Sequence, residues 1–395
     1  MRHPYALAGS LAASLVALCC SADPEAAAQE QTIAPPALAA DHAQVDPAIK
    51  DALAGVFEGA LVPGAVAAIA RAEGDTQVAA WGLRKAGGEA PMQPGDPVHV
   101  GSDTKAMTAV LAARQVDAGL LRWDSTLEEV LPDLAPRVHE AYRGATLTQF
   151  LRHTSGAPAN APNWRDFTDR SLRERRIELA AASLKEAPAA APGTGFLYSN
   201  LGYMVAGAMV EAARDAPWEE LMRTDVFEPL GIEGAGFGAP GTLGEEDAPW
   251  GHVVRRGAPS PVQLDNDPAL GPAGTVHLPV AGWARFVLQF TDAAAAEDAA
   301  AENLEGADAP FLSAASREKL VEVGLDDYAC GWLVTKRGWA RGTALTHSGS
   351  NTTWFATVWI APGTNRAFLV AANAAGPAVP GLVDRAIGAL IALEE

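Results

Sequence analysis

The chain has 395 residues, which is enough for one large domain or two compact ones. Hydrophobic residues make up 49% of the sequence and can form a substantial core. The net charge of -19, from 29 basic and 48 acidic residues, argues against nucleic acids and anionic membranes as partners. An anionic substrate would need a local site to attract it, because the surface as a whole does not.

The N-terminus has the pattern of an export signal. Arg2-His3 gives a short basic start, residues 5–18 are almost unbroken apolar sequence, and Ala26-Ala27-Ala28 offers a small-residue cleavage site. The apolar run is shorter than the ~20 residues that a membrane-spanning helix needs. We therefore expect residues 1–28 to be a signal peptide, with cleavage after Ala22 as the alternative. The mature protein is expected to be periplasmic or secreted, without a membrane span.

Three cysteines occur in the sequence. Cys19 and Cys20 lie in the expected signal peptide and do not favour a lipid anchor, because Leu18 or Cys19 would precede the modified cysteine where a small residue is expected. After signal removal only Cys330 remains, so no intramolecular disulfide can form. Cys330 lies in an apolar stretch without a neighbouring base and is expected to be a small buried residue.

The first part of the predicted domain contains a helix and a β-hairpin. Residues 29–44, rich in Pro and Ala, are expected to be a linker. Apolar residues then recur at helical spacing over residues 47–57. Two strand-like runs follow, at 64–71 and 77–83, and the turn signal Glu73-Gly74-Asp75 between them predicts a hairpin.

The middle of the chain is predicted to be mainly helical. Residues 84–97 are rich in Gly, Pro and charge and indicate a loop. Ser102 opens a predicted helix that runs to about Ala118, with Gly119 as its stop, and this helix is apolar on most sides. The clearest helices after it are at 142–153, 173–184, 202–214 and 280–290.

Near the C-terminus the sequence pattern changes to that of strands. Residues 292–310 are rich in Ala, Glu and Asp and predict an exposed, mobile excursion outside the core. Beyond them, β-branched and aromatic residues predict strands at 328–335, 344–347, 353–360 and 366–373. A last helix is expected over residues 379–393.

Strands at both ends and helices in the middle predict an α+β fold. The simplest arrangement is an α/β sandwich with one antiparallel sheet built from both chain ends, plus an inserted, mainly helical subdomain. We expect one domain over residues 45–395. Its α/β part would comprise 45–101 and 311–395, and its helical part 102–310.

The stretch Ser102-Asp103-Thr104-Lys105 carries the clearest chemical signal. Residues three apart on a helix share a face, so an unprotonated Lys105 amine could take the proton of the Ser102 hydroxyl. The same spacing occurs at Ser316-Arg317-Glu318-Lys319, in a charged helix start, where it is interpreted as a chance match. The four-residue pattern therefore needs support from the rest of the sequence.

Two later elements give that support. Tyr198-Ser199-Asn200 is the only Tyr-x-Asn of the chain, and His347-Ser348-Gly349 ends one strand-like run and leads into another. Two Lys-x-Gly stretches compete with the second element. Lys85-Ala86-Gly87 comes before Ser102, and Lys336-Arg337-Gly338 is explained by a turn.

Other chemistries find little support in the sequence. It has no Gly-x-Ser-x-Gly elbow, no His-Glu-x-x-His, no clustered His/Cys pattern and no Gly-rich phosphate loop after a strand. We therefore expect no metal and no cofactor. His153-Thr154-Ser155-Gly156 holds both a histidine and a serine, but it is interpreted as a structural turn that ends the 142–153 helix.

With these motifs in order, the chain resembles the penicillin-recognising serine hydrolases, nearest to class C β-lactamases, D-alanyl-D-alanine carboxypeptidases and their esterase relatives. The resemblance extends from about Val45 to the C-terminus and implies a β-lactamase/transpeptidase-like fold. Further stretches that carry it are Leu151-Arg152-His153-Thr154-Ser155-Gly156, Pro192-Gly193-Thr194-Gly195-Phe196-Leu197-Tyr198, Leu201-Gly202-Tyr203 and His347-Ser348-Gly349-Ser350.

The resemblance implies a role for each candidate residue. Ser102 would become acylated, after Lys105 takes its proton. Tyr198 would be the second proton handler, and its phenolate would be favoured beside a lysine ammonium, so that the two titrate as a coupled pair. Asn200 would hold Lys105 and the substrate. The backbone N–H groups of Ser102 and Ser350 would form the oxyanion hole.

The third element departs from the β-lactamase pattern. His347 replaces the lysine that helps β-lactamases hold the drug's carboxylate, and a histidine is mostly neutral at neutral pH. The wall of the substrate-binding site is expected to consist of His347, Ser348, Gly349 and Ser350. The His-x-Gly pattern also occurs in the carboxypeptidase, D-aminopeptidase and esterase branches of the family. The sequence therefore predicts an exported serine hydrolase acting on a small ester, amide or peptide. Two alternatives remain: a class C-like β-lactamase, and a non-catalytic relative that binds cell-wall peptides or a partner protein.

Overall fold

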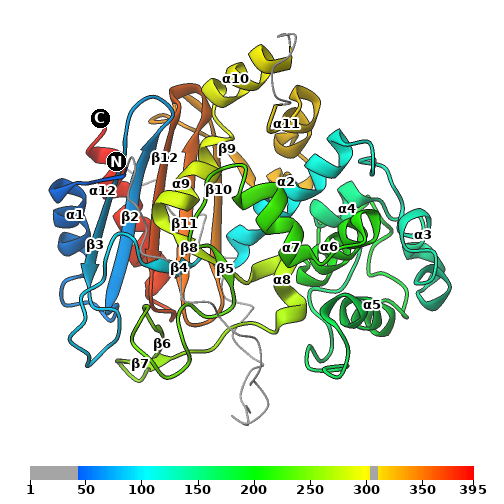
Figure 1. Cartoon of the computed structure of the whole chain (residues 1–395), viewed down its shortest axis with the longest axis horizontal. Coiled ribbons are helices and arrows are strands. Elements are labelled where there is room, and N and C mark those ends of the chain that lie inside the picture. The colour runs from blue at the N-terminus through cyan, green and yellow to red at the C-terminus, as the bar shows by residue number, and fades with distance from the viewer. Residues whose placement is uncertain (1–42, 303–309) are drawn as a thin grey trace. The chain divides into compact units, whose positions relative to one another are not determined.

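A seven-stranded sheet built from both ends of the chain organises the structure (Figure 1). The computed structural model describes residues 43–302 and 310–395, so the expected signal peptide and most of the expected linker lie outside the described residues. In spatial order the strands are β1 (Ala43–Val45), β3 (Thr76–Gly82), β2 (Gly64–Arg71), β12 (Arg366–Ala372), β11 (Phe355–Ala361), β10 (Gly342–Ser350) and β9 (Leu333–Arg337).

The two halves of the sheet meet where β2 pairs with β12. This pairing is antiparallel and places Ala65 opposite Ala372 and Arg71 opposite Arg366. The sheet from both chain ends is thus as predicted, with one difference: β1 pairs with β3 in parallel. β1 also begins at Ala43, so the expected linker overlaps the domain by two residues.

Strand β2 is apolar from Gly64 to Ala70 because helices cover both of its faces. Ala65, Ala67 and Ile69 pack in a core with α1 (Pro47–Phe57) and α12 (Val379–Ala392). The alternate residues Val66, Ala68 and Ala70 belong to the second core, with α9 (Val280–Leu288). Figure 1 shows α1 and α12 on one side of the sheet and α9 on the other. A helix from the expected helical part therefore completes the sandwich.

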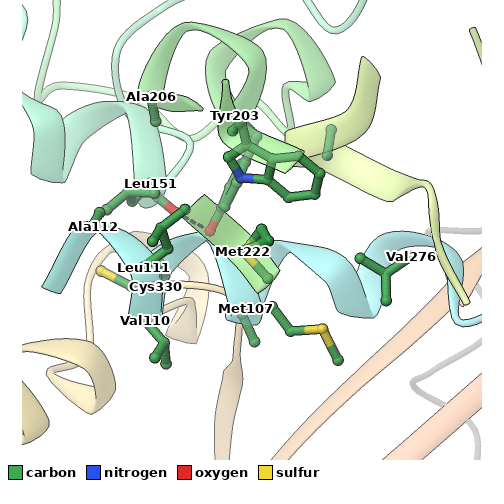
Figure 2. Close-up of a cluster of buried hydrophobic side chains, with 14 of the residues drawn as sticks. Met107, Val110, Leu111, Ala112, Leu151, Tyr203, Ala206, Met222, Val276 and Cys330 are labelled. Carbon is green, nitrogen blue, oxygen red and sulfur yellow. Dashed lines mark hydrogen bonds between the residues drawn. The ribbon is translucent and has the colours of Figure 1, made fainter. Parts of the chain in front are cut away.

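The helical part surrounds one buried helix, α2 (Thr104–Asp117). Eleven of its side chains, from Thr104 to Ala113 and Gln115, are buried. Met107, Val110 and Leu111 lie in a cluster with residues of the neighbouring helices (Figure 2). α2 contacts α6 (Asn200–Arg214), α7 (Trp218–Met222), α8 (Gly271–Gly274) and α11 (Ala314–Val321), and α6 in turn contacts α3 (Leu127–Val130), α4 (Leu147–Leu151) and α5 (Leu172–Ser183).

The helix predicted over residues 142–153 is interrupted. A 3₁₀ turn covers Glu140–Tyr142, and α4 begins only at Leu147, with Thr146 and Gln149 forming a capping box. The interruption arises from a long-range contact, because Thr146 forms a β-bridge with Thr126 and Ala145 accepts a hydrogen bond from the Leu127 N–H.

Five short strands in the expected helical part and just before it were not predicted. β4 (Pro97–His99), β8 (Val276–Pro279) and β5 (Gly236–Phe237) form a small sheet, and β6 (Gly251–Arg255) pairs with β7 (Ala258–Val262). They are two to five residues long, and β7 contains two prolines, so sequence alternation gives little signal.

The acidic, alanine-rich stretch begins as a helix, α10 (Asp292–Glu302), rather than as irregular chain. The side chains from Asp292 to Ala300 lie outside the core as expected, and Asp298 pairs with Arg317. Cys330 is free and fully buried, and burial raises the pKa of its thiol, as expected for a structural residue. Within residues 43–302 and 310–395, none of the helices is both long enough and apolar enough to cross a membrane.

Candidate active site

Ser102 lies in the 3₁₀ turn Gly101–Asp103 that connects β4 to α2. Gly101 has a φ of 53°, and a Cβ at this position would lie 2.3 Å from the backbone nitrogen of Ser350. Only glycine combines this conformation with such a close approach. The turn therefore holds the Ser102 segment against β10.

Lys105, on the first turn of α2, is fully buried beside Ser102. Its Nζ lies 3.1 Å from Ser102 Oγ, 2.8 Å from Asn200 Oδ1 and 2.7 Å from the Ala273 carbonyl oxygen. The two carbonyl oxygens can only accept, so they take two N–H groups, whereas the Ser102 hydroxyl can also donate. In the neutral amine the remaining lone pair is thus directed at the Ser102 hydroxyl.

Burial lowers the pKa of Lys105 well below its usual 10.5, and the nearby Asp103 carboxylate offsets only part of this. The same shift favours the neutral amine that the geometry requires. Both observations make Lys105 suited to accept a proton from Ser102.

Tyr198 lies just before α6, whose first turn is capped by Ser199. Its ring centroid is 4.8 Å from Lys105 Nζ, and its side chain is hydrogen-bonded to Ser102. The expected phenolate is not supported. Burial raises the pKa of Tyr198, the hydrogen bond with Ser102 offsets part of the rise, and the Asp103 charge adds to it. Tyr198 is therefore a neutral phenol, which can donate a proton.

Asn200, the first residue of α6, connects Lys105 to a neighbouring loop. Its Oδ1 accepts from Lys105, while its Nδ2 donates to Asn160 Oδ1 at 2.9 Å. Its backbone N–H donates to the Ala159 carbonyl oxygen. These contacts fix the amide so that its oxygen faces the lysine.

His347, on β10, has both ring nitrogens engaged within the protein. Nδ1 lies 3.2 Å from Asp103 Oδ1, and Nε2 lies 3.3 Å from the Tyr328 hydroxyl. Asp103 was not identified as a site residue from the sequence. It is buried, and burial raises the pKa of its carboxyl, partly offset by the hydrogen bond and charge of His347.

The other candidate residues of β10 differ in their placement. A Cβ on Gly349 would lie 1.8 Å from the Val100 carbonyl oxygen and 2.6 Å from the Ser102 nitrogen, so this strand touches the Ser102 turn directly. Ser350 Oγ donates to the Trp354 carbonyl oxygen. Ser348 is exposed and hydrogen-bonds Thr357 of β11, on the strand face opposite to His347.

His153 does more than end a helix. It follows α4 with a φ of 58°, is fully buried, and its ring centroid lies 4.2 Å from that of Tyr198. Its Nδ1 accepts from the Ser199 N–H at 3.0 Å. Burial lowers the pKa of His153 well below its usual value, and the charges of Lys105 and His347 add to this. The turn interpretation was correct but missed the support that this neutral ring gives to Tyr198.

The second Ser-x-x-Lys has a different environment. Ser316 Oγ donates to Asp117, and Lys319 pairs with Glu322. The serine and the lysine of this copy thus have separate partners, as expected for a chance match.

Residues 49–393 match the family model described as Beta-lactamase. This chain belongs to the beta-lactamase family. The family is one of serine hydrolases, and the match covers both parts of the sheet and the helices between them. The predicted family is thereby confirmed.

Curated relatives of this beta-lactamase family member carry several names. The chain is 29% identical to penicillin-binding protein 4 of Amycolatopsis lactamdurans over 324 residues, 77% of this chain and 78% of that protein. It is also 29% identical to the lovastatin esterase of Penicillium rubens over 175 residues, which span 38% of this chain and 42% of the esterase.

Solved structures confirm the β-lactamase/transpeptidase-like α+β fold. The crystal structure of SurE aligns with a TM-score of 0.70 at 24% identity, covering 86% of this chain and 74% of that one. The octameric penicillin-binding protein homologue from Pyrococcus abyssi aligns with a TM-score of 0.67 at 20% identity, covering 87% and 75%. At these identities the likeness concerns the fold alone.

Proposed function

We propose that this protein is an exported serine hydrolase that forms an acyl-enzyme on Ser102 and hydrolyses an ester or a peptide-like amide. The observation that carries the proposal is the buried Lys105 Nζ, 3.1 Å from Ser102 Oγ, with its two other hydrogen-bonding directions taken by carbonyl oxygens. A serine hydroxyl is a weak nucleophile until a neighbouring base removes its proton.

In the acylation step, Ser102 Oγ attacks the substrate's carbonyl carbon while Lys105 Nζ takes the hydroxyl proton. The carbonyl oxygen becomes an oxyanion, which the N–H groups of Ser102 and Ser350 stabilise. The close approach of Gly101 and Gly349 supports this pairing, since it brings the two backbone segments together.

The tetrahedral intermediate then collapses and expels the alcohol or amine. Tyr198, a neutral phenol hydrogen-bonded to Ser102, donates a proton to the leaving group and regains one from the Lys105 ammonium. In deacylation a water molecule loses a proton to the same pair, attacks the acyl carbon and releases the carboxylic acid. Ser102 regains its proton, so each step balances.

The surroundings of His347 favour an ester or amide without a carboxylate beside the scissile bond. A β-lactam's carboxylate needs a cation or a free donor, and both nitrogens of His347 already face Asp103 and Tyr328. A carboxylate there would also lie near the buried Asp103. The lovastatin esterase among the relatives supports the same choice, and penicillin-binding protein 4 keeps the β-lactam alternative under test.

The first experiment is labelling with a fluorophosphonate and a fluorescent penicillin, followed by turnover of short-chain nitrophenyl esters, D-amino-acid peptides and a chromogenic cephalosporin. We expect fluorophosphonate labelling and ester or peptide turnover, both abolished in Ser102→Ala. Ser316→Ala, in the second Ser-x-x-Lys, is the matched control and should behave as wild type.

Two results would change the proposal. Absence of Ser102-dependent labelling would favour the non-catalytic alternative, a binding relative. Efficient cephalosporin turnover with poor ester and peptide activity would favour the class C-like β-lactamase. Export is tested separately by N-terminal sequencing of protein from the periplasm or medium, where a mature start near Gln29 or Asp23 is expected.

A further inference from the structure

The two amide donors of the proposed oxyanion hole belong to segments far apart in the sequence. Ser102 follows Gly101 in the turn before α2, whereas Ser350 ends β10 and precedes Asn351. The contact of these segments through glycine explains their closeness but not what fixes their orientation. The residues on either side of the two donors fix this orientation.

His99, the last residue of β4, holds the segment of Ser102. It is fully buried, and its Nδ1 accepts a hydrogen bond from the Gly101 N–H at 3.0 Å. A ring nitrogen that accepts is unprotonated, so the proton of the neutral ring is on Nε2. Nε2 lies 2.9 Å from Asp265 Oδ1, an ion-pair distance without the geometry of a hydrogen bond, so the ring and the carboxylate are in electrostatic contact.

Asn351 holds the segment of Ser350. Its side-chain oxygen accepts from the N–H groups of Thr353 and Trp354, which closes the turn between β10 and β11. Its Nδ2 donates to Asp265 Oδ1 at 2.9 Å. Asn351 is buried, so this turn is fixed from inside the protein.

Asp265 is therefore the common partner of both segments, through a single oxygen. It comes from the connection between β7 and the 3₁₀ turn Pro268–Leu270, and its side chain is 7% exposed. Its neighbour Asn266 anchors this connection by donating to the Gly274 carbonyl oxygen. A rigid third segment thus contacts both donor segments.

We infer that Asp265 is a positioning residue for the oxyanion hole, acting through His99 on Ser102 and through Asn351 on Ser350. The inference rests on the proposed function. It explains a buried carboxylate at this place in terms of the reaction: the donors must be aligned before the substrate arrives, because stabilisation of the oxyanion depends on preorganised dipoles. None of the three side chains needs to touch the substrate.

The test compares Asp265→Ala with Asp265→Asn and with Asp267→Ala, a matched control on the same connection. For a nitrophenyl ester we expect Asp265→Ala to lower kcat by roughly 10- to 100-fold, less than the ~100-fold or more that follows complete loss of a donor. KM should change less than about threefold, because the ground state gains little from the oxyanion hole. Asp265→Asn, which keeps an acceptor oxygen, should be intermediate.

The inhibition constant of a boronic acid gives a second readout. Its tetrahedral adduct with Ser102 places an oxygen in the oxyanion hole, so the constant should rise by about the factor by which kcat falls. Asp267→Ala loses the ion pair with Arg175 and should lower the melting temperature with kcat within about threefold of wild type. If Asp265→Ala does not fold, Asn351→Ala is used with the same expectation.

The outcomes distinguish a failure of the inference about Asp265 from a failure of the proposed function. A wild-type protein without Ser102-dependent turnover overturns both. An active wild type whose Asp265 and Asn351 variants keep kcat, or lose no more than Asp267→Ala does, overturns the inference alone. A rise in KM at constant kcat would also overturn it, since it would place Asp265 in substrate binding.

Discussion

Gly349→Ala tests whether the contact between β10 and the Ser102 turn controls activity. The added Cβ would lie 1.8 Å from the Val100 carbonyl oxygen and 2.6 Å from the Ser102 nitrogen. Both are backbone atoms, which cannot rotate away as a side chain can. Since an ordinary contact begins at 3.4 Å, the strand and the turn must separate by about 1.5 Å.

That separation is large compared with the tolerance of a catalytic site. A displacement of ~1 Å costs about 100-fold in rate, so we expect kcat/KM for a nitrophenyl ester to fall at least 100-fold. The same strain should lower the stability by about 1–3 kcal/mol, the usual range for overpacking. Steady-state kinetics and urea denaturation measure the two effects separately.

Gly338→Ala is the control, because Gly338 lies in the turn between β9 and β10 and has no atom within 4 Å of the added Cβ. It should keep wild-type kinetics. The reasoning would be refuted if a folded Gly349→Ala retained more than about a third of the wild-type kcat/KM, because a forced separation of this size cannot be catalytically silent.

Three further predictions follow from the charges of buried groups. Lys105→Arg should lower kcat/KM by ~100- to 10,000-fold, because a guanidinium keeps its proton and has no lone pair for Ser102; a residual rate near wild type would contradict this. The pH profile of kcat/KM should rise through the lowered pKa of Lys105 and show no loss from Tyr198 ionisation below pH 10, since the pKa of Tyr198 is raised above its usual 10.0. Burial lowers the pKa of His277 from 6.5 to about 4, so the unfolded chain binds more protons between these values. Stability should therefore fall by ~3 kcal/mol as the pH drops from 6.5 to 4, and His277→Gln should flatten this dependence in denaturation experiments.

Elements with a strong local pattern could be predicted closely from the sequence. The helix Pro47–Phe57 and the strand Gly64–Arg71 have the predicted bounds, because their apolar residues recur with the period of one structure. The interruption of the helix expected over 142–153 could not be predicted, because the bridge between Thr146 and Thr126 overrides local helix preference. The small sheet of β4, β8 and β5 also depends on distant partners, not on its own residues.

In the candidate site, too, residues in short local motifs could be predicted, whereas contacts between distant residues could not. Ser102, Lys105, Tyr198 and Asn200 could be selected from short motifs and their order, and the structure brings them within contact of one another. The partnership of Asp103 with His347 could not be predicted, because 244 residues separate them and an acid at a helix start is ordinary. His99-Val100-Gly101 has the same His-x-Gly spacing as His347-Ser348-Gly349. The order of the motifs does not select it, because it lies before Ser102.

The pairing of β2 with β12 also has a consequence for how the molecule is made. The Gly64 N–H donates to Asn373 Oδ1 across 309 residues, and β10 and β12 are synthesised after almost all the rest. Proteins dominated by such distant contacts fold slowly, because long loops must close before the contacts form. A growing chain would therefore carry Ser102 and Lys105 long before it carries the strand that completes their surroundings. The nascent protein should remain unreactive towards a fluorophosphonate until its last strands have joined the sheet.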